Sequence, residues 1–310
     1  MNEPNARGLI AVDKKGGKVL FLDPASYETT LVLDDFARVP HELLVVPESS
    51  TAYVPIYGDG IHGRNPNPGH LISIVDLAQR RHVADIDLSP YIAPHGMLIG
   101  PDGLLYVTCE NSGVVALVDR ARREVVGAIE TESTNAHRIA ISPDGRWLYT
   151  ENEEDASISV IDRQARKLVR QVTTPQPLAG LAVSPDGKLI VAVSDEDPVL
   201  FLIDSTSFEI TRTVPLDQVP KAAQIARYSP DGQILLVTSL QSATATLIDA
   251  SFTKQTTLAV GQQPMDAAFF GSSLFVACQG DGSIHIIDLP SRRVAHSFAA
   301  GVGCETLAFF

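Results

Sequence analysis

Three histidines occupy the same place in three consecutive sequence repeats. His41 begins HELLVVP, His95 begins HGMLIGPDG and His137 begins HRIAISPDG. Imidazole is a common ligand of divalent metals, and its unperturbed pKa near 6.5 also suits it to proton transfer. Equivalent positions of a repeat converge when the repeats close into a ring. The three histidines therefore predict a shared metal-binding or catalytic site.

A carboxylate stands at the equivalent position of the last repeat. Glu305 opens ETLAFF, whereas Ala179, Gln224 and Met265 open the repeats in between. If the chain closes into a ring, Glu305 becomes the neighbour of His41. Three imidazoles and one carboxylate suit a divalent ion such as Zn, Mn, Fe or Ca, with Glu305 as fourth ligand or as a base beside the ion. Because imidazole binds metal only when deprotonated, occupancy is expected to fall below roughly pH 6. The predicted metal ligands are His41, His95, His137 and Glu305.

The repeats themselves consist of four short strands. In the best-formed unit, HRIAIS is followed by the turn Pro143-Asp144-Gly145, and then by WLYTEN, SISVID and the more polar KLVRQVTT. Proline presets φ for such a turn and glycine accepts positive φ. The repeats begin 40 to 54 residues apart. This period, with four strands in each repeat, is typical of the blades of a β-propeller.

The seventh repeat is split between the two ends of the chain. GCETLAFF at the C-terminus is only a first strand, and GLIAVD, KVLFLD and TTLVLDD near the N-terminus supply the other three. Closure by both ends removes free strand edges. We therefore predict an all-β, seven-bladed β-propeller, a single domain over residues 1–310 whose last blade is closed by N- and C-terminal strands. The expected blades are residues 38–92, 93–133, 134–175, 176–217, 218–260, 261–300, and 301–310 together with 1–37.

The longest loop falls on the same face as the histidines. Strand direction alternates within a blade, so the start of strand one and the loop between strands two and three share a face. In blade one this loop is YGDGIHGRNPNPGH, residues 57–70, and its Gly, Pro and Asn content predicts irregular structure. Long loops in compact domains often serve function. We expect the loop to fold over the channel mouth and to contribute His62, Arg64 or His70.

Catalytic roles follow from these placements. His62 and Arg64 could orient an anionic or carbonyl substrate, Tyr57 could donate a proton, and Glu305 could act as a base. Acidic residues of neighbouring loops could reach the same face, although solvation alone also explains them. The predicted catalytic residues are Glu305, His62, Arg64 and Tyr57, and the additional acidic residues are Glu110, Glu151, Glu153 and Asp195.

The composition limits the partners. A formal net charge of −13 argues against a nucleic-acid partner, whose phosphates require a basic surface. No apolar run reaches membrane-spanning length, so no membrane partner is expected. The N-terminus lacks the pattern of a signal peptide, which favours a cytoplasmic location. The three cysteines show no CxxC or CxxCH spacing, so neither disulfides nor c-type haem are expected. We expect a small-molecule substrate and a monomer or weak oligomer.

The repeat sequences resemble a known family. LYVTCENSGVVALVD, LYTENEEDASISVID and the SPDG turns are similar to the YVTN repeat of seven-bladed propellers, a group that includes lactonase-like and cytochrome-d1-like members. The resemblance covers nearly the whole chain. By analogy with the lactonase-like members, it implies a metal-dependent hydrolase of a lactone or a similar cyclic ester.

Two alternative functions remain open. One is a metal-assisted lyase or isomerase that abstracts a proton beside a carbonyl, with Glu305 or a histidine as base. The other is a non-catalytic propeller that binds a protein or carries a haem-like cofactor. No P-loop, GxGxxG or GxSxG motif is present, which argues against a nucleotide site and a serine hydrolase. The single tryptophan, Trp147, argues against a quinoprotein dehydrogenase with repeated tryptophan motifs.

Overall fold

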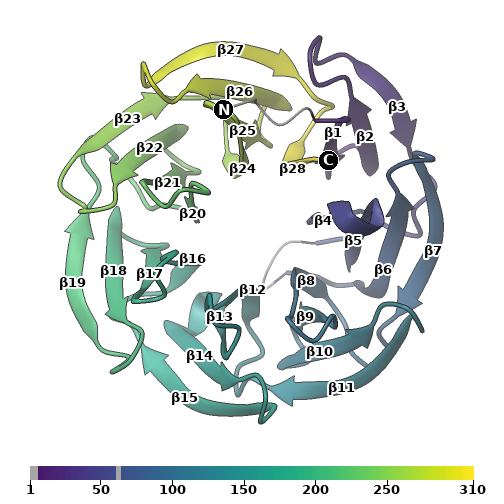
Figure 1. Ribbon diagram of the computed structural model, residues 1–310, viewed down its shortest axis with the longest axis horizontal. Helices are drawn as coiled ribbons and strands as arrows, with labels where there is room; N and C mark the ends of the chain where they lie inside the picture. Colours follow the sequence, from purple (N-terminus) through teal and green to yellow (C-terminus); the bar gives the residue numbers. More distant parts are fainter. Residues whose placement is uncertain (1–5, 61–63) are drawn as a thin grey trace.

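The computed structural model describes residues 6–60 and 64–310 and confirms the seven-bladed propeller. Seven antiparallel sheets of four strands stand around a central channel (Figure 1). Within the described chain, the helices are too short to cross a bilayer, and none has the apolar length for it.

The first three blades contain β4 (Leu44–Val46), β5 (Thr51–Gly58), β6 (Pro68–Asp76) and β7 (Arg81–Asp87); β8 (Pro94–Ile99), β9 (Leu105–Cys109), β10 (Val114–Asp119) and β11 (Glu124–Glu130); and β12 (Ala136–Ile141), β13 (Trp147–Asn152), β14 (Ser157–Asp162) and β15 (Lys167–Thr173).

The remaining blades follow the same order. They contain β16 (Leu178–Val183), β17 (Leu189–Ser194), β18 (Val199–Asp204) and β19 (Ile210–Pro215); β20 (Ile225–Tyr228), β21 (Ile234–Ser239), β22 (Thr244–Asp249) and β23 (Gln255–Ala259); β24 (Pro264–Phe270), β25 (Ser273–Cys278), β26 (Ser283–Asp288) and β27 (Arg293–Ala299); and β28 (Cys304–Phe309), β1 (Leu9–Asp13), β2 (Lys18–Leu22) and β3 (Thr29–Leu33). Two 3₁₀ helices, η1 (Pro47–Ser49) and η2 (Glu153–Asp155), lie in blades one and three.

The last blade closes the ring as predicted. β28 pairs antiparallel with β1, so that Leu9 lies opposite Phe309 and Ala11 lies opposite Leu307. In Figure 1 the purple N-terminal strands lie beside the yellow C-terminal strand. Each blade thus has a complete set of four strands, and in blade seven β1 is paired on both sides, with β28 and with β2.

The core lies between neighbouring blades. Tyr106 and Leu117 of blade two pack with Leu148 and Ile161 of blade three, and all four are buried. All five residues of β9 are buried, because both faces of this strand are covered by other blades. The outer strand β11 consists of exposed and half-buried residues with Ile129 buried, as expected of a strand with one face in solvent. Burial between blades therefore fixes the orientation of the inner strands that carry the site.

The SPDG turns are held by their own side chains. In blade three, Ser142 Oγ donates to Asp144 Oδ1 at 2.5 Å and accepts from the Trp147 amide at 2.8 Å. Gly145 has φ +70°, a left-handed conformation that glycine adopts without strain. These turns lie at the opposite end of the first strand from the histidines.

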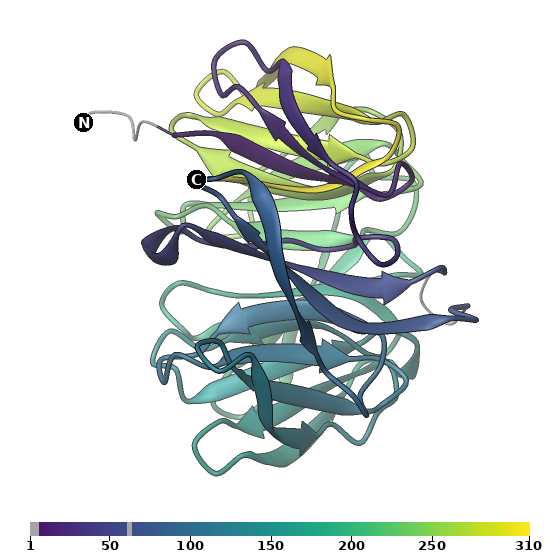
Figure 2. The same ribbon diagram turned by 90° about the vertical axis from the view of Figure 1, so that its right-hand side faces the viewer.

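Regular structure extends further into the blade-one insertion than predicted. β5 continues to Gly58 and β6 begins at Pro68, and these two residues pair with each other, so 57–58 and 68–70 of the segment predicted to be irregular belong to strands. Proline is tolerated at the first residue of a strand. Gly69 fits because a Cβ there would lie 1.8 Å from the Ile56 carbonyl oxygen. Figure 2 shows this hairpin ending on the face opposite the C-terminus.

Candidate metal centre

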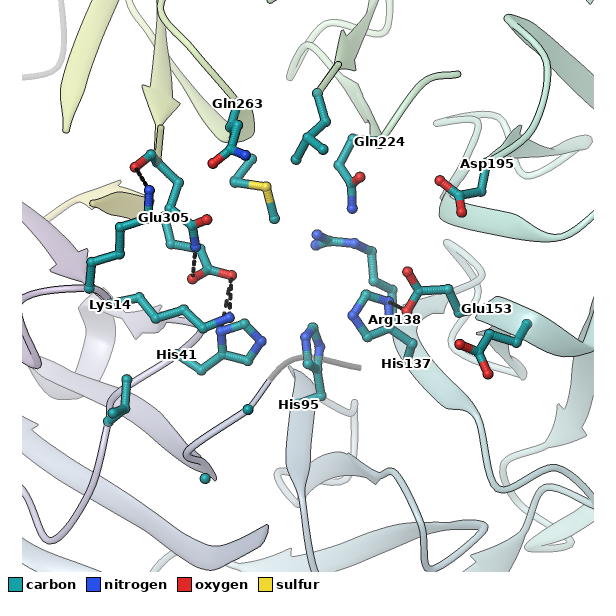
Figure 3. Close-up of a pocket in the computed structure, with 18 of the residues that line it drawn as sticks. Lys14, His41, His95, His137, Arg138, Glu153, Asp195, Gln224, Gln263 and Glu305 are labelled. Carbon is teal, nitrogen blue, oxygen red and sulfur yellow. Dashed lines mark hydrogen bonds and ion pairs between the residues drawn. The ribbon is translucent and has the colours of Figure 1, made fainter. Parts of the chain in front are cut away.

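The three predicted histidines lie together at one mouth of the channel (Figure 3). His95 is on β8, His137 is on β12, and His41 precedes β4. The His95 ring centroid lies 4.4 Å from that of His41 and 3.8 Å from that of His137. Their exposed fractions are 5% for His41, 2% for His95 and 5% for His137. The chain therefore buries three imidazoles from three different blades in direct contact.

Bulges at the start of the inner strands direct these side chains into the channel. The pairing of β8 with β9 shifts between Pro94 and Met97, and the pairing of β12 with β13 shifts between Ala136 and Ile139. A bulge changes the direction in which a side chain points. Consequently both His137 and the adjacent Arg138 line the same cavity, although neighbours on a regular strand point to opposite faces.

A threonine and a glycine set the distance between β8 and β12. Thr108 Oγ1 donates to the His137 carbonyl oxygen at 2.6 Å and accepts from the Gly96 amide at 2.8 Å. Gly96 directly follows His95, and a Cβ at Gly96 would lie 2.8 Å from the His137 carbonyl oxygen. The absence of a side chain at Gly96 thus allows the two histidine-bearing strands to approach closely.

The first group that could hold a metal is His95, Glu110 and His137. All three are buried, and one ligand atom from each lies within 4.8 Å of the others. His137 Nε2 lies 3.9 Å from Glu110 Oε1. Two ligands of one ion with bonds of about 2.1 Å can lie up to about 4.2 Å apart, so this spacing fits a shared ion.

Tyr57 holds the carboxylate of this group. Its hydroxyl donates to Glu110 Oε2. Burial, and then the charge of Glu110, raise the pKa of Tyr57 far above its ordinary value, so the phenol stays protonated. Such a hydrogen bond orients a ligating carboxylate.

The second group is His137, Glu151 and Glu153. His137 Nδ1 lies 3.4 Å from Glu151 Oε2 and 3.5 Å from Glu153 Oε2. Burial lowers the pKa of His137, but the charges of Glu153, Glu151 and Glu110 outweigh it and raise the pKa to about 9. The sequence-based expectation of an unperturbed histidine pKa near 6.5 is therefore wrong for His137, because three carboxylates surround its ring.

His95 has the opposite electrostatic environment. Burial, followed by the charges of His137 and His41, lowers its pKa well below the ordinary value. Its Nδ1 is buried and has no hydrogen-bond partner within residues 6–60 and 64–310. A neutral imidazole with an unused nitrogen is what a metal ion requires.

Glu305 lies with His41 rather than in either group. Its Oε1 lies 3.0 Å from His41 Nδ1 and accepts from Lys14 Nζ at 3.2 Å, while its Oε2 accepts from Gln279 Nε2 at 2.8 Å. Burial alone would raise the pKa of Glu305, but His41 and Lys14 lower it to about 2. Glu305 is therefore a fixed anion with both oxygens engaged.

These residues face a cavity of about 750 Å³. Besides the histidines and charged groups, its lining includes Gln224, Gln263, Leu240 and Met265. Arg138 extends into the cavity (Figure 3), and its Nη1 lies 3.4 Å from Glu42 Oε1. The other lining residues include Lys14, Glu153, Asp195, Gln279 and Glu305.

The remaining sequence-predicted residues have different places. Arg64 is exposed and does not line the cavity, and His70 Nε2 lies 4.0 Å from Asp87 Oδ1 on the blade surface. His62 lies outside the described residues. Of the insertion, Gly58, Asp59 and Gly60 line the cavity. The role predicted for this loop stays a prediction.

Lys14, Gln279 and Arg138 are among the residues of the site that were not predicted. Lys14 and Gln279 bind Glu305, and Arg138 lies beside the histidines. Arg138 carries one usable signal, since it directly follows His137 at the start of an inner strand. Lys14 and Gln279 follow β1 and β25, and nothing in the sequence marks them as partners of Glu305.

The donor set discriminates between possible cofactors. Buried imidazoles and carboxylates in both groups could bind a metal ion. A haem iron would be held by an axial side chain such as histidine, with the macrocycle beside it. Here the His95 and His137 rings are packed against each other, and His137 faces Glu110, Glu151 and Glu153, which would repel the propionates of a haem. These residues fit a metal ion and do not fit a haem.

Comparison with known proteins supports the fold assignment. The hydrazine synthase of Kuenenia stuttgartiensis has a similar structure, with a TM-score of 0.71 and 20% sequence identity over 85% of this chain and 87% of that chain. At this identity the likeness shows a shared fold alone. No curated protein matches the chain significantly. The model of the family described as "Cytochrome D1 heme domain" matches residues 99–272, more than half of the chain. The chain therefore belongs to this family of propellers.

Proposed function

We propose that this propeller is a metal-dependent enzyme that hydrolyses a lactone or a similar cyclic ester at the channel mouth. The observation that carries the proposal is the buried group of His95, Glu110 and His137, whose ligand atoms lie within 4.8 Å of one another. Its place on the wall of a substrate-sized cavity favours a catalytic ion over a structural one. The metal ligands are thus His95, Glu110 and His137 rather than the full set predicted from the repeats.

A divalent ion at this position would polarise an ester carbonyl and activate a water molecule. The chain supplies the remaining functions. Tyr57 fixes Glu110 through its hydroxyl, and Thr108 fixes the spacing of the two histidine strands. His41 lines the cavity beside the first group and is the candidate general base.

Glu305 has a positioning role in this proposal. A carboxylate with a pKa of about 2 is a poor base at neutral pH. Its contact with His41 Nδ1 instead holds the imidazole in one orientation and stabilises the charge that forms when His41 accepts a proton. Gln224 and Gln263 also line the cavity, and their amides can bond the oxygens of a small polar ester.

A lyase or isomerase is the second candidate, and the His41–Glu305 pair favours it. An oriented base beside a metal-polarised carbonyl can remove the neighbouring proton as readily as it activates water. The product distinguishes the two reactions. Hydrolysis adds one molecule of water to the substrate, whereas proton abstraction exchanges a carbon-bound hydrogen for deuterium in D₂O.

The test combines metal analysis with activity. Protein depleted by a chelator and protein reloaded with Zn²⁺, Mn²⁺ or Fe²⁺ would be assayed on a panel of lactones, with mass and proton spectra recorded in D₂O. We expect activity only with metal, and its loss in His95→Ala but not in His296→Ala, because His296 is an exposed residue of the outer strand β27. Full activity of verified metal-free protein would refute a metal-dependent enzyme. Deuterium exchange without hydrolysis would support a lyase or isomerase and refute the hydrolase.

A further inference from the structure

We propose that His137 bridges two metal ions, with a second ion held by His137 Nδ1, Glu151 and Glu153. This inference rests on the proposed function for the first ion, which lies on the Nε2 side of the same ring. The two groups of ligands share only His137, and they meet it at opposite nitrogens: Glu110 lies near Nε2, and Glu151 and Glu153 lie near Nδ1.

Two carboxylates face the Nδ1 atom of His137 at distances longer than an ordinary hydrogen bond. One N–H can serve one carboxylate well, yet two carboxylates face Nδ1 at 3.4 and 3.5 Å. Both distances exceed the usual range of about 2.7–3.2 Å for such a bond. The Oε1 atom of Glu151, a residue with no exposed surface, has no hydrogen-bond partner in the described part of the chain. A buried carboxylate oxygen that lacks a partner requires an explanation, and a bound cation is one that also accounts for the second carboxylate nearby.

The charges around the His137 imidazole also favour a second ion. Among the described residues, Glu42, Glu110, Glu151 and Glu153 lie beside His95 and His137, and Arg138 Nη1 lies 3.4 Å from Glu42 Oε1. Lys14 is already engaged by Glu305. Buried carboxylates are stable only when paired with cations or bound to metals.

The bridge determines what each ion can do. The two nitrogens of an imidazole are about 2.2 Å apart, so ions bound to both would lie roughly 6 Å apart with bonds of about 2.1 Å. This exceeds the separation of about 3.5–4 Å at which two ions share one reacting oxygen. The second ion would therefore neutralise Glu151 and Glu153 and hold His137, while substrate meets the first ion. Binding of both ions removes both ring protons of His137, which pass to the solvent.

Calorimetric titration of metal-depleted protein with Zn²⁺, followed by elemental analysis, tests the second site. We expect two ions per chain in the wild type and one in Glu153→Gln, whose side chain is nearly isosteric. The neighbouring Glu154 belongs to neither group, so Glu154→Gln serves as the matched control and should keep two ions. Thermal melting would verify that each variant is folded. If Glu153→Gln does not fold, Glu151→Gln and Glu153→Asp provide the same comparison.

Cu²⁺ loading provides an independent readout of the bridge. Two Cu²⁺ ions joined by one imidazolate couple magnetically, so the paramagnetic signal of the wild type should fall well below that of two isolated ions. In Glu153→Gln the signal of one isolated ion should appear. One ion per chain that depends on Glu110 but not on Glu153 would overturn the second site and leave the proposed function intact. Two ions without coupling would overturn the bridge, and no bound ion in any form would overturn the proposed function itself.

Discussion

His41 Nδ1 lies 3.0 Å from Glu305 Oε1, and this contact joins the first blade to the strand that completes the last one. Glu305 is on β28, which pairs with β1 to close the ring. The site therefore lies across the seam where the two ends of the chain meet. Closure of the fold and assembly of the site depend on the same strand.

Removal of β28 should accordingly abolish both the closure of the ring and the assembly of the site. Deletion of residues 304–310 exposes the edge of β1 and removes Glu305. We expect loss of the cooperative thermal transition and aggregation, because β1 would lose its partner and expose its edge. Circular dichroism melting and size-exclusion chromatography measure the result. A truncated protein that melts like the parent would show that the seam does not hold the ring together.

Glu305→Gln should separate metal binding from catalysis. The change removes an anion that pairs with His41 and Lys14, and breaking a buried pair costs about 3–5 kcal/mol of stability. We expect the metal content to stay unchanged and turnover to fall about 10–100-fold, as is typical when a positioning partner is lost. Glu154→Gln is the control. Loss of metal in Glu305→Gln would instead identify Glu305 as a ligand.

Gly96→Ala should disturb the site by separating the two strands that carry His95 and His137. The new methyl group would lie 2.8 Å from the His137 carbonyl oxygen and force β8 and β12 apart. We expect a loss of about 1–3 kcal/mol in the free energy of unfolding, together with weaker metal binding. Gly127→Ala is the matched control, because its Cβ would meet only Arg166 Nη1 at an ordinary 3.5 Å. Equal metal affinity in the two variants would contradict the proposed role of the close approach.

Metal affinity should depend on pH well above the ordinary histidine range. His137 has a pKa of about 9 in the metal-free protein, so below pH 9 an ion must displace its proton. The apparent affinity should therefore rise about tenfold per pH unit between pH 7 and 9 and then level off. His95, whose pKa lies well below 6.5, adds no competition in this window. Affinity that is constant from pH 7 to 9 would contradict the environment assigned to His137.

The raised pKa of His137 also affects how the stability of the metal-free protein depends on pH. Because the pKa of His137 is raised on folding, its ion pairs with Glu151 and Glu153 stabilise the protein fully below the unfolded pKa of about 6.5. This stabilisation is lost as the pH rises towards 9. Chelator-treated protein should thus melt at a lower temperature at pH 9 than at pH 6.5, and His137→Gln should reduce that difference.

The closed ring of blades and the clustering of the three histidines could be predicted, because both follow from the register of the sequence repeats. Each repeat starts its first strand at the same point, so His41, His95 and His137 occupy one register, and the split last repeat places Glu305 beside His41. These relations depend on the order of strands alone. The structure places the three rings in contact and Glu305 next to His41, as this register requires.

The choice of carboxylates could not be predicted, because it depends on contacts between blades. Glu110 follows β9 of blade two and reaches His137 of blade three, whereas Glu151 and Glu153 approach the same ring from the other side. Arg138 joins the cavity only because a bulge interrupts the alternation of β12. A bulge has no reliable signature in a single sequence, and so the acidic residues could not be distinguished from solvated loop residues.

The most direct test of the central claim is an anomalous-scattering map from a crystal of protein loaded with Zn²⁺, recorded on both sides of the zinc absorption edge. The proposed centre predicts a strong zinc peak between His95, Glu110 and His137 Nε2, with Glu305 still bound to Lys14 and His41. Two results would contradict it. One is a zinc peak between His41 and Glu305, and the other is a zinc-loaded crystal with no zinc peak at the three imidazoles.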